Sequence, residues 1–244
     1  MSVSVSFLLG PSESGFTRMR NDGFLHKYFL NNGSKRLHKW VHYFDIYERH
    51  FERFRETKPI FLEIGVMGGG SLNMWKEYFG SGSKIIGIDI NPRCKIHECD
   101  GIEIFIGSQD DEGLLAEVLS KYPHIDIVLD DGSHMSRHMI ASFEFLYPRI
   151  SKSGVYMVED THANYWEEWE GGYKKSDTFI EFSKSKIDEL NAVHTRGAVP
   201  PTTFTKTTDS MAVYDSVIVF EKGVQGSRQD LITNGMMFSS NTIE

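Results

Sequence analysis

Short apolar runs alternate with helical periodicity along the middle of the chain. Apolar runs bounded by turn signals predict buried strands, and apolar positions that recur at helical spacing predict helices. The five predicted strands cover residues 60–64, 84–89, 102–106, 125–130 and 154–159. The helices predicted between them cover residues 71–78, 111–121 and 135–147. Strands that alternate with helices indicate a parallel sheet covered on both faces, as in a doubly wound α/β fold.

The segments before and after this alternating core have other patterns. Residues 1–35 are rich in Ser, Gly and Asn and predict an irregular arm. Residues 37–57 place aromatic side chains at helical spacing, so we expect a helix that packs on the core or on a partner subunit. Residues 211–214 and 217–220 are separated by Asp-Ser and predict an antiparallel hairpin at the edge of the sheet.

These patterns predict one Rossmann-like domain of seven strands with an antiparallel last strand. We expect it to cover residues 58–222, with an N-terminal arm and aromatic helix over 1–57 and a C-terminal tail over 223–244. The arm would cover the site or join subunits, which favours a homo-oligomer. The polar and aromatic stretch 160–210, with one helix near 177–191, follows the fifth strand, where doubly wound folds build substrate sites.

Composition excludes several classes of protein. The chain carries 26 Lys+Arg against 34 Asp+Glu, and its formal net charge of -8 disfavours nonspecific binding to nucleic acid. No apolar stretch approaches the length that spans a membrane, so no membrane partner is expected. The two cysteines are too few for a disulfide framework, and a poor signal-peptide pattern at the start favours the cytoplasm.

A glycine-rich loop follows the first predicted strand. Gly65, Gly68, Gly69 and Gly70 let the backbone approach a ligand closely, and the helix that begins near Ser71 presents free N–H groups. The second strand ends in Asp89, a carboxylate that can accept both hydroxyls of a ribose. Together these features predict a nucleoside-containing cofactor. The G-x-G-x-x-G pattern of dinucleotide binding is absent, as is the nucleoside-triphosphate P-loop.

Acidic and histidine residues end the fourth and fifth strands. The first segment reads Asp130-Asp131-Gly-Ser-His134, and the second begins with Glu159-Asp160. The carboxyl ends of parallel strands meet at one edge of a sheet, so these side chains should converge near the glycine loop. Neighbouring carboxylates repel one another unless a cation relieves them, which predicts Mg²⁺ or another divalent cation. Asp131, Glu159 and Asp160 would be the ligands, and His134 a general base acting on a hydroxyl.

The glycine loop, Asp89 and Gly107-Ser-Gln-Asp110 together resemble class I S-adenosylmethionine-dependent methyltransferases. The resemblance implies that the glycine loop holds the methionine part, that Asp89 holds the ribose, and that the residues after the third strand flank the adenine. The residues assigned to the cofactor on this basis are Glu63, Gly65, Gly68, Gly70, Ser71, Asp89, Gln109, Asp110 and Asp130.

The acidic segments at the strand ends resemble a narrower group, the macrocin and mycinamicin sugar O-methyltransferases, with the cephalosporin-biosynthesis protein as a relative. The similar segments are residues 130–134 and 159–166. The resemblance implies the same Mg²⁺ ligands, Asp131, Glu159 and Asp160, with His134 as the catalytic histidine. His162 can be a second base, a substrate contact or a packing residue. Tyr165 and Trp166 can stack on a sugar or anchor their loop.

The function expected from the sequence is therefore metal-dependent O-methylation of a small molecule, with a sugar or a glycosylated natural product as the expected acceptor. An NAD(P)- or nucleotide-sugar-dependent oxidoreductase is the enzymatic alternative, and the glycine spacing disfavours it. A non-catalytic, cofactor-binding accessory protein of a biosynthetic complex is the other alternative. The acidic trio and His134 disfavour that reading, because a protein that only binds a cofactor does not need them.

Overall fold

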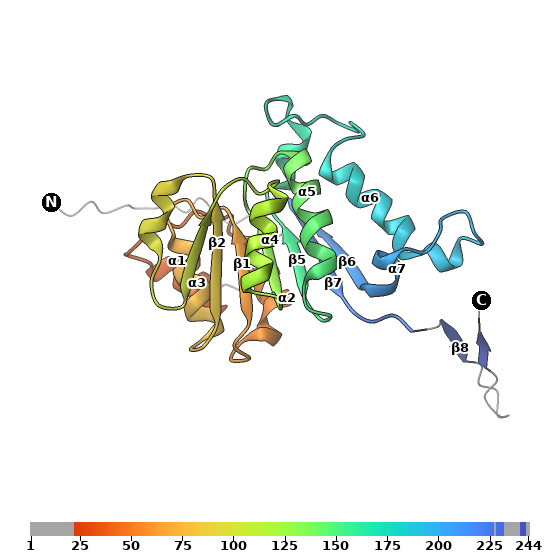
Figure 1. Ribbon diagram of the computed structural model, residues 1–244, viewed down its shortest axis with the longest axis horizontal. Helices are drawn as coiled ribbons and strands as arrows, with labels where there is room; N and C mark the ends of the chain where they lie inside the picture. The colour runs from red at the N-terminus through yellow and green to blue at the C-terminus, as the bar shows by residue number, and fades with distance from the viewer. Residues whose placement is uncertain (1–21, 227, 232–239, 243–244) are drawn as a thin grey trace, which may run out of the picture.

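A seven-stranded sheet forms the centre of the protein. The computed structural model describes residues 22–226, 228–231 and 240–242. The strand order is β3-β2-β1-β4-β5-β7-β6 (Figure 1). The strands are β1 Ile60–Ile64, β2 Lys84–Asp89, β3 Ile102–Ile106, β4 Ile127–Asp130, β5 Val155–Val158, β6 Thr208–Tyr214 and β7 Val217–Lys222. β1 to β5 pair in parallel, whereas β7 runs antiparallel to both β5 and β6. This arrangement confirms the predicted Rossmann-like fold.

Helices cover both faces of the sheet, because successive strand residues point to opposite faces and are apolar on each. Phe61 faces a core with α1, α2 and α3, while its neighbour Leu62 faces a second core with α4, α5, α6 and α7. The helices are α1 Phe24–Asn31, α2 Tyr43–Phe51, α3 Gly70–Phe79, α4 Glu112–Lys121, α5 Ser136–Leu146, α6 Phe179–Leu190 and α7 Thr203–Thr207. The part of the chain that the structure describes also contains short 3₁₀ segments, which are η1 Glu52–Phe54, η2 Pro92–His97, η3 Tyr147–Arg149, η4 Thr161–Tyr165, η5 Glu167–Trp169 and η6 Ala192–His194. Within the described residues, no helix has both the length and the apolar character needed to cross a membrane.

The N-terminal region differs from the sequence prediction in two ways. Residues 24–31 form α1 where an irregular arm was expected, and residues 1–21 of that arm lie outside the described residues. The aromatic helix begins at Tyr43 rather than near residue 37, and residues 36–40 have no regular secondary structure. In that segment the carbonyl of Arg36 accepts a bond from the Gly70 N–H, so the chain follows the glycine loop there.

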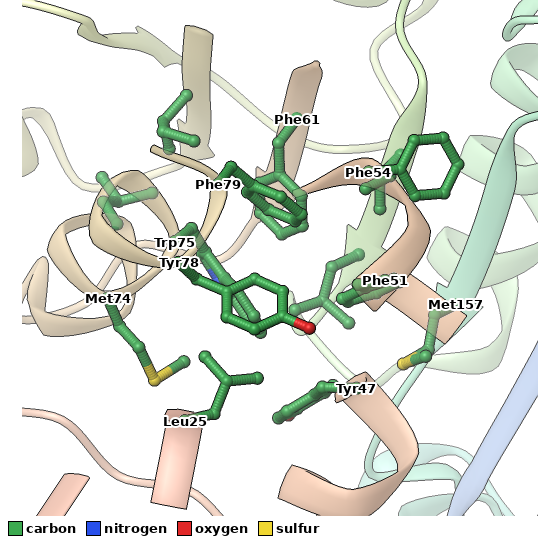
Figure 2. Packing of buried hydrophobic residues seen from close by; sticks show 14 of the residues in the cluster. Leu25, Tyr47, Phe51, Phe54, Phe61, Met74, Trp75, Tyr78, Phe79 and Met157 are labelled. Atoms are coloured by element: carbon green, nitrogen blue, oxygen red, sulfur yellow. The ribbon is translucent and has the colours of Figure 1, made fainter. Parts of the chain in front are cut away.

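The aromatic residues of α2 are buried within the chain. Tyr47 meets Trp75 of α3 with ring centroids 5.1 Å apart, and Phe51 stacks beside Tyr47 and meets Phe61 of β1 edge-on (Figure 2). Such packing at a sheet face explains why these positions are apolar. It also removes the argument that an exposed aromatic helix joins subunits.

The carboxyl ends of β1, β4 and β5 lie next to one another. Ile64 pairs with Asp130, and Asp130 pairs with Val158. The next residues in the chain, Gly65, Asp131 and Glu159, therefore start their loops at the same edge of the sheet. The tail contributes a separate two-stranded sheet, β8 Gln229–Leu231 and β9 Ser240–Thr242, which lies apart from the main sheet (Figure 1).

Candidate active site and cofactor pocket

A cavity of about 360 Å³ opens at this edge of the sheet. Its walls come from the glycine loop, the ends of β2, β4 and β5, and residues 36–40. A smaller hollow of about 160 Å³ adjoins it, and both are bordered by Gly65, Asp89 and Gly132. A ligand held at Asp89 can therefore extend in two directions, toward the acidic strand ends or toward Gly107, Ser108 and Gln109.

Asp89 is fixed by the backbone around it. Its Oδ2 accepts bonds from the N–H groups of Val66 and Met67 at 2.9 and 3.0 Å, and its Oδ1 accepts from Asn91 N–H at 2.8 Å. Burial alone would raise the pKa of Asp89, but these backbone bonds lower it below its ordinary value. The group is thus a carboxylate at neutral pH, held in place with capacity to accept further hydroxyl bonds.

The first glycine allows two loops to touch. Gly65 has φ +94°, and a Cβ placed there would lie 2.0 Å from the backbone oxygen of Asp131. Glycine suits this position because it adopts positive φ without strain and has no side chain to separate the loops. Gly68 and Gly70 similarly lie against the backbone and Cβ of Arg36. The glycine loop is therefore packed between the loop of Asp131 and the segment of Arg36.

Glu63 is enclosed below the glycine loop. Its side chain accepts bonds from Ser71 Oγ at 2.7 Å and from Trp75 Nε1 at 3.2 Å. Burial raises the pKa of Glu63 to about 7, although Lys39 and the two donors act in the opposite direction. A direct bond from Glu63 to a cofactor would have to replace one of these contacts, whereas Ser71 itself borders the cavity.

Asp130 and Gln109 form a buried clamp between loops. Gln109 Nε2 donates to both oxygens of Asp130 at 3.0 and 2.9 Å, and Ser142 Oγ donates to Asp130 at 2.9 Å. Gln109 Oε1 in turn accepts the N–H of Ser133 at 2.8 Å. Asp130 is fully buried, so it shapes the loop instead of lining the cavity. Asp110 lies farther out, with its carboxylate 3.4 Å from His138 Nε2.

Asp131, His134 and Asp160 form a cluster that could hold a metal ion. One ligand atom from each lies within 4.8 Å of the others. His134 Nε2 is 3.6 Å from Asp160 Oδ2 and 4.0 Å from Asp131 Oδ1. His134 and Asp160 both have left-handed backbone conformations, with φ of 57° and 56°. Such strain in two non-glycine residues is commonly found at functional sites.

Glu159 points into the protein beside this cluster. One of its oxygens accepts a bond from Lys39 Nζ and the other accepts from the hydroxyl of Tyr47. Lys39 Nζ also contacts Asp131 Oδ2 at 2.6 Å and lies 3.7 Å from Glu63 Oε1. Burial alone would lower the pKa of Lys39, but the surrounding carboxylates raise it well above its ordinary value. Burial and the charge of Asp131 raise the pKa of Glu159.

Two of the three predicted metal ligands lie in the candidate cluster, and the third lies beside it. Asp131 and Asp160 lie in the candidate cluster, His134 joins them, and the Glu159 carboxylate is engaged by Lys39 and Tyr47. Lys39 and the tyrosine hydroxyls of α2 were not among the predicted site residues. The available signal was the presence of tyrosine at positions 43 and 47, one helical turn apart, where phenylalanine would satisfy an apolar core.

The residues after Asp160 lie beside the acidic cluster. His162 Nδ1 bonds to Ser216 Oγ and lies 3.9 Å from Asp160 Oδ1. Its ring meets the rings of Trp40 and Trp166 edge-on. Tyr165 and Trp166 are about half exposed. The part of this loop that reaches His134 is Trp169, with ring centroids 5.6 Å apart.

Comparisons with known proteins identify sugar O-methyltransferases. No model of a known protein family matches the chain. The chain is 34% identical over 205 residues to 8-demethyl-8-alpha-L-rhamnosyl tetracenomycin-C 2'-O-methyltransferase of Streptomyces olivaceus, covering 79% of this chain and 53% of that protein. It is 39% identical over 165 residues to demethylmacrocin O-methyltransferase of Streptomyces fradiae, covering 62% and 41%. Mycinamicin VI 2''-O-methyltransferase of Micromonospora griseorubida is 37% identical over 154 residues, covering 59% and 38%.

The solved structures lead to the same group of proteins. The MycE methyltransferase from the mycinamycin pathway, in complex with Mg, SAH and mycinamycin VI, matches with a TM-score of 0.69 and 31% identity. That match covers 84% of this chain and 51% of that chain. A second MycE structure with Mg and SAH gives a TM-score of 0.72 at 31% identity, covering 82% and 54%. The chain thus spans about half the length of the curated relatives it matches.

Proposed function

We propose that this chain, a homologue of sugar O-methyltransferases with the Rossmann-like fold of MycE, transfers a methyl group from S-adenosylmethionine to a hydroxyl of a glycosylated small molecule. The observation that carries the proposal is the cluster of Asp131, His134 and Asp160 at the sheet edge that also holds Asp89 and the glycine loop. An acid–histidine cluster beside a nucleoside pocket suits a reaction in which a hydroxyl is deprotonated next to a bound methyl donor.

In this proposal the donor lies across the two adjoining hollows. Its ribose bonds to Asp89, its adenine enters the smaller hollow beside Gln109, and its methionine part follows the glycine loop toward Ser71. Gly65, Gly68 and Gly70 act by bringing the loop backbone close. Glu63, Asp110 and Asp130 support the surrounding loops through their bonds within the protein.

A divalent cation fits the acidic cluster. Asp131 and Asp160 offer hard oxygen ligands of the kind that Mg²⁺ prefers. Within the described residues, His134 Nδ1 is buried with no hydrogen-bond partner, so the cluster also contains an unsatisfied polar atom. Glu159 stays in the proposal as a third ligand, which requires it to exchange a bond to Lys39 or Tyr47 for one to the ion. When bound, Mg²⁺ would lower the pKa of a hydroxyl that contacts it.

His134 is the proposed general base. The acceptor hydroxyl gives its proton to His134 Nε2, the nitrogen that faces Asp131 and Asp160. The acceptor oxygen forms a bond to the methyl carbon while the carbon–sulfur bond breaks, and that electron pair stays on sulfur to give neutral S-adenosylhomocysteine. The two carboxylates stabilise the imidazolium that results. Positioning of donor and acceptor supplies most of the rate enhancement.

The remaining parts of the proposal concern the chain and its partners. Residues 58–222 would form the methyl-transfer domain, with 160–210 on the acceptor side, 1–57 as the N-terminal part and 223–244 as a tail. His162, Tyr165 and Trp166 would contact the acceptor. A homo-oligomer and a cytoplasmic location complete the proposal; the first draws support from exposed apolar side chains such as Met67 and Ile96, and the second from two free cysteines.

Methyl transfer by the unaltered chain and by His134→Ala tests the proposed methyltransferase function. Mycinamicin VI and demethylated macrolide glycosides are incubated with radiolabelled S-adenosylmethionine and Mg²⁺, and methylated product is separated from donor. We expect transfer to at least one such glycoside, and a loss of turnover of about 10²-fold or more in His134→Ala with donor affinity retained. If His134→Ala binds the donor and forms as much product as the unaltered chain, His134 is not the general base. Donor binding without transfer to any glycoside would favour an accessory protein.

A further inference from the structure

Three side chains from α2 and the segment before it reach the acidic cluster. Lys39, Tyr43 and Tyr47 each contact a carboxylate of the cluster or of its neighbour Glu159. Tyr43 and Tyr47 are four residues apart in α2 and therefore lie on one side of the helix, and Lys39 joins this row from the non-helical segment before it. The polar ends of this row thus point to the carboxyl ends of β4 and β5, while the tyrosine rings pack in the aromatic core.

The row contacts one carboxylate oxygen of Asp131 and one of Asp160, and the second oxygen of each faces His134. Lys39 Nζ lies 2.6 Å from Asp131 Oδ2, whereas Asp131 Oδ1 faces His134. The hydroxyl of Tyr43 donates to Asp160 Oδ1 at 2.7 Å, whereas Asp160 Oδ2 is the oxygen nearer to His134. The Tyr43 oxygen also accepts the backbone N–H of Asp160 at 3.3 Å. Both the side chain and the backbone of Asp160 are therefore fixed by one phenol.

Asp160 needs such support because its backbone is strained. A non-glycine residue with φ 56° has a less favourable conformation than an extended one. It persists only where the surroundings hold it. The N–H of Ala163 bonds to the carbonyl of Asp160 at 3.0 Å, and the Tyr43 hydroxyl holds the N–H and the carboxylate of the same residue.

We infer that Lys39 and Tyr43 are positioning residues, which hold the outer oxygens of Asp131 and Asp160 so that the inner oxygens face a divalent ion and His134. The inference rests on the proposed function, because it concerns the metal of that site. It also assigns the N-terminal stretch to the metal site itself, rather than to a cover or an interface. Groups that orient a metal ligand in this way commonly change metal affinity by about 10–100-fold when removed.

Tyr43→Phe tests the inference because it removes one oxygen and keeps the ring. Mn²⁺ serves as the probe, and free Mn²⁺ is measured by electron paramagnetic resonance during titration of the metal-stripped full chain. We expect the Kd for Mn²⁺ to rise by about tenfold or more in Tyr43→Phe. Lys39→Arg keeps the positive charge but replaces the ammonium with a planar guanidinium, so it should also weaken Mn²⁺ binding. This second variant keeps the test decisive if the first does not fold.

Tyr78→Phe is the matched control. Tyr78 belongs to the same aromatic core, and its buried hydroxyl has no hydrogen-bond partner within the described residues. Its Kd for Mn²⁺ should stay within about twofold of the unaltered chain. Unchanged affinity in folded Tyr43→Phe or Lys39→Arg, as judged by circular dichroism, would overturn the inference while leaving the proposed function intact. Absence of Mn²⁺ binding by the unaltered chain would overturn the metal-dependent function, and this inference with it.

Discussion

Lys39→Met is the substitution for which the structure makes the sharpest stability prediction. Lys39 has a side chain only 2% exposed, and its ammonium contacts Asp131 and Glu159 and lies 3.7 Å from Glu63. Methionine has a similar length and keeps the apolar contacts, so the main change is the loss of one positive charge. Glu63 and Glu159 would then be buried near Asp131 without a cation.

The expected loss follows from the cost of an unpaired buried charge. Removing one partner of a buried ion pair commonly costs about 3–5 kcal/mol. All three partners of the Lys39–Glu63–Glu159 group are almost fully buried, so solvent screening reduces this value little. For a chain of this size such a loss lowers Tm by about 10 °C.

The pH dependence separates this cause from a simple packing defect. The pKa of Glu63 is already raised to about 7 with Lys39 present, and the pKa of Glu159 is raised too. Because the charge of Lys39 lowers the pKa values of Glu63 and Glu159, its removal should raise both pKa values further. A glutamate has a pKa near 4.3 in the unfolded chain. When its pKa is higher in the folded protein, the folded state loses stability as the pH rises from the unfolded-state pKa through the folded-state pKa. The loss of stability in Lys39→Met should therefore be larger at pH 8 than at pH 5.

Urea unfolding of both chains at pH 5 and pH 8, without divalent metal, measures the difference. Lys222→Met is the matched control, because Lys222 is also buried but its Nζ donates to the backbone carbonyls of Tyr147, Pro148 and Ile150. Its acceptors are uncharged, so its loss of stability should be similar at both pH values. A loss below about 1 kcal/mol at pH 8, or an equal loss at both pH values for Lys39→Met, would refute the electrostatic reasoning.

Three further substitutions test other parts of the structure. Gly65→Ala places a Cβ 2.0 Å from the Asp131 carbonyl at φ +94°, so strain and overpacking should cost about 2–6 kcal/mol in urea unfolding; a neutral result would contradict the close approach of the loops. Asp111→Ala removes the cap of α4, which accepts two N–H bonds, and should cost about 1 kcal/mol, whereas no change would mean that the cap is not needed. Arg36 lines the cavity beside the glycine loop, so we expect its guanidinium to pair with the carboxylate of the bound ligand. Arg36→Gln removes this charge and should lower the affinity for S-adenosylhomocysteine about tenfold, as measured by calorimetry. Affinity for 5'-methylthioadenosine, which has no carboxylate, should stay the same; equal losses for both ligands would refute that contact.

The fold could be predicted because its signals are local and repeated. The strands between residues 60 and 158 are short apolar runs, and periodicity alone placed each of them within a few residues. The start of the aromatic helix could not be placed in this way. Residues 36–40 are not helical and contact the glycine loop, which lies far along the chain and which no local pattern records.

Only those residues of the candidate site that directly follow a strand could be predicted from the sequence. Asp131 and Asp160 meet because β4 and β5 are neighbours, which the order of elements indicated. The contacts of Lys39 and Tyr43 were missed because they depend on how α2 docks across the sheet face. Burial of Asp130 could not be foreseen either, since its partner Gln109 comes from the loop after a different strand.

Calorimetric titration of the metal-stripped chain tests whether the protein binds both a methyl donor and a divalent metal ion. S-adenosylmethionine is added first and Mg²⁺ second, with NAD as the control ligand, to the unaltered chain and to Asp160→Ala. We predict that the methyl donor binds and NAD does not, and that a Mg²⁺ site is present in the unaltered chain and lost in Asp160→Ala. Binding of NAD in place of the methyl donor would contradict the methyltransferase account, and donor binding without any Mg²⁺ site would contradict its metal-dependent mechanism.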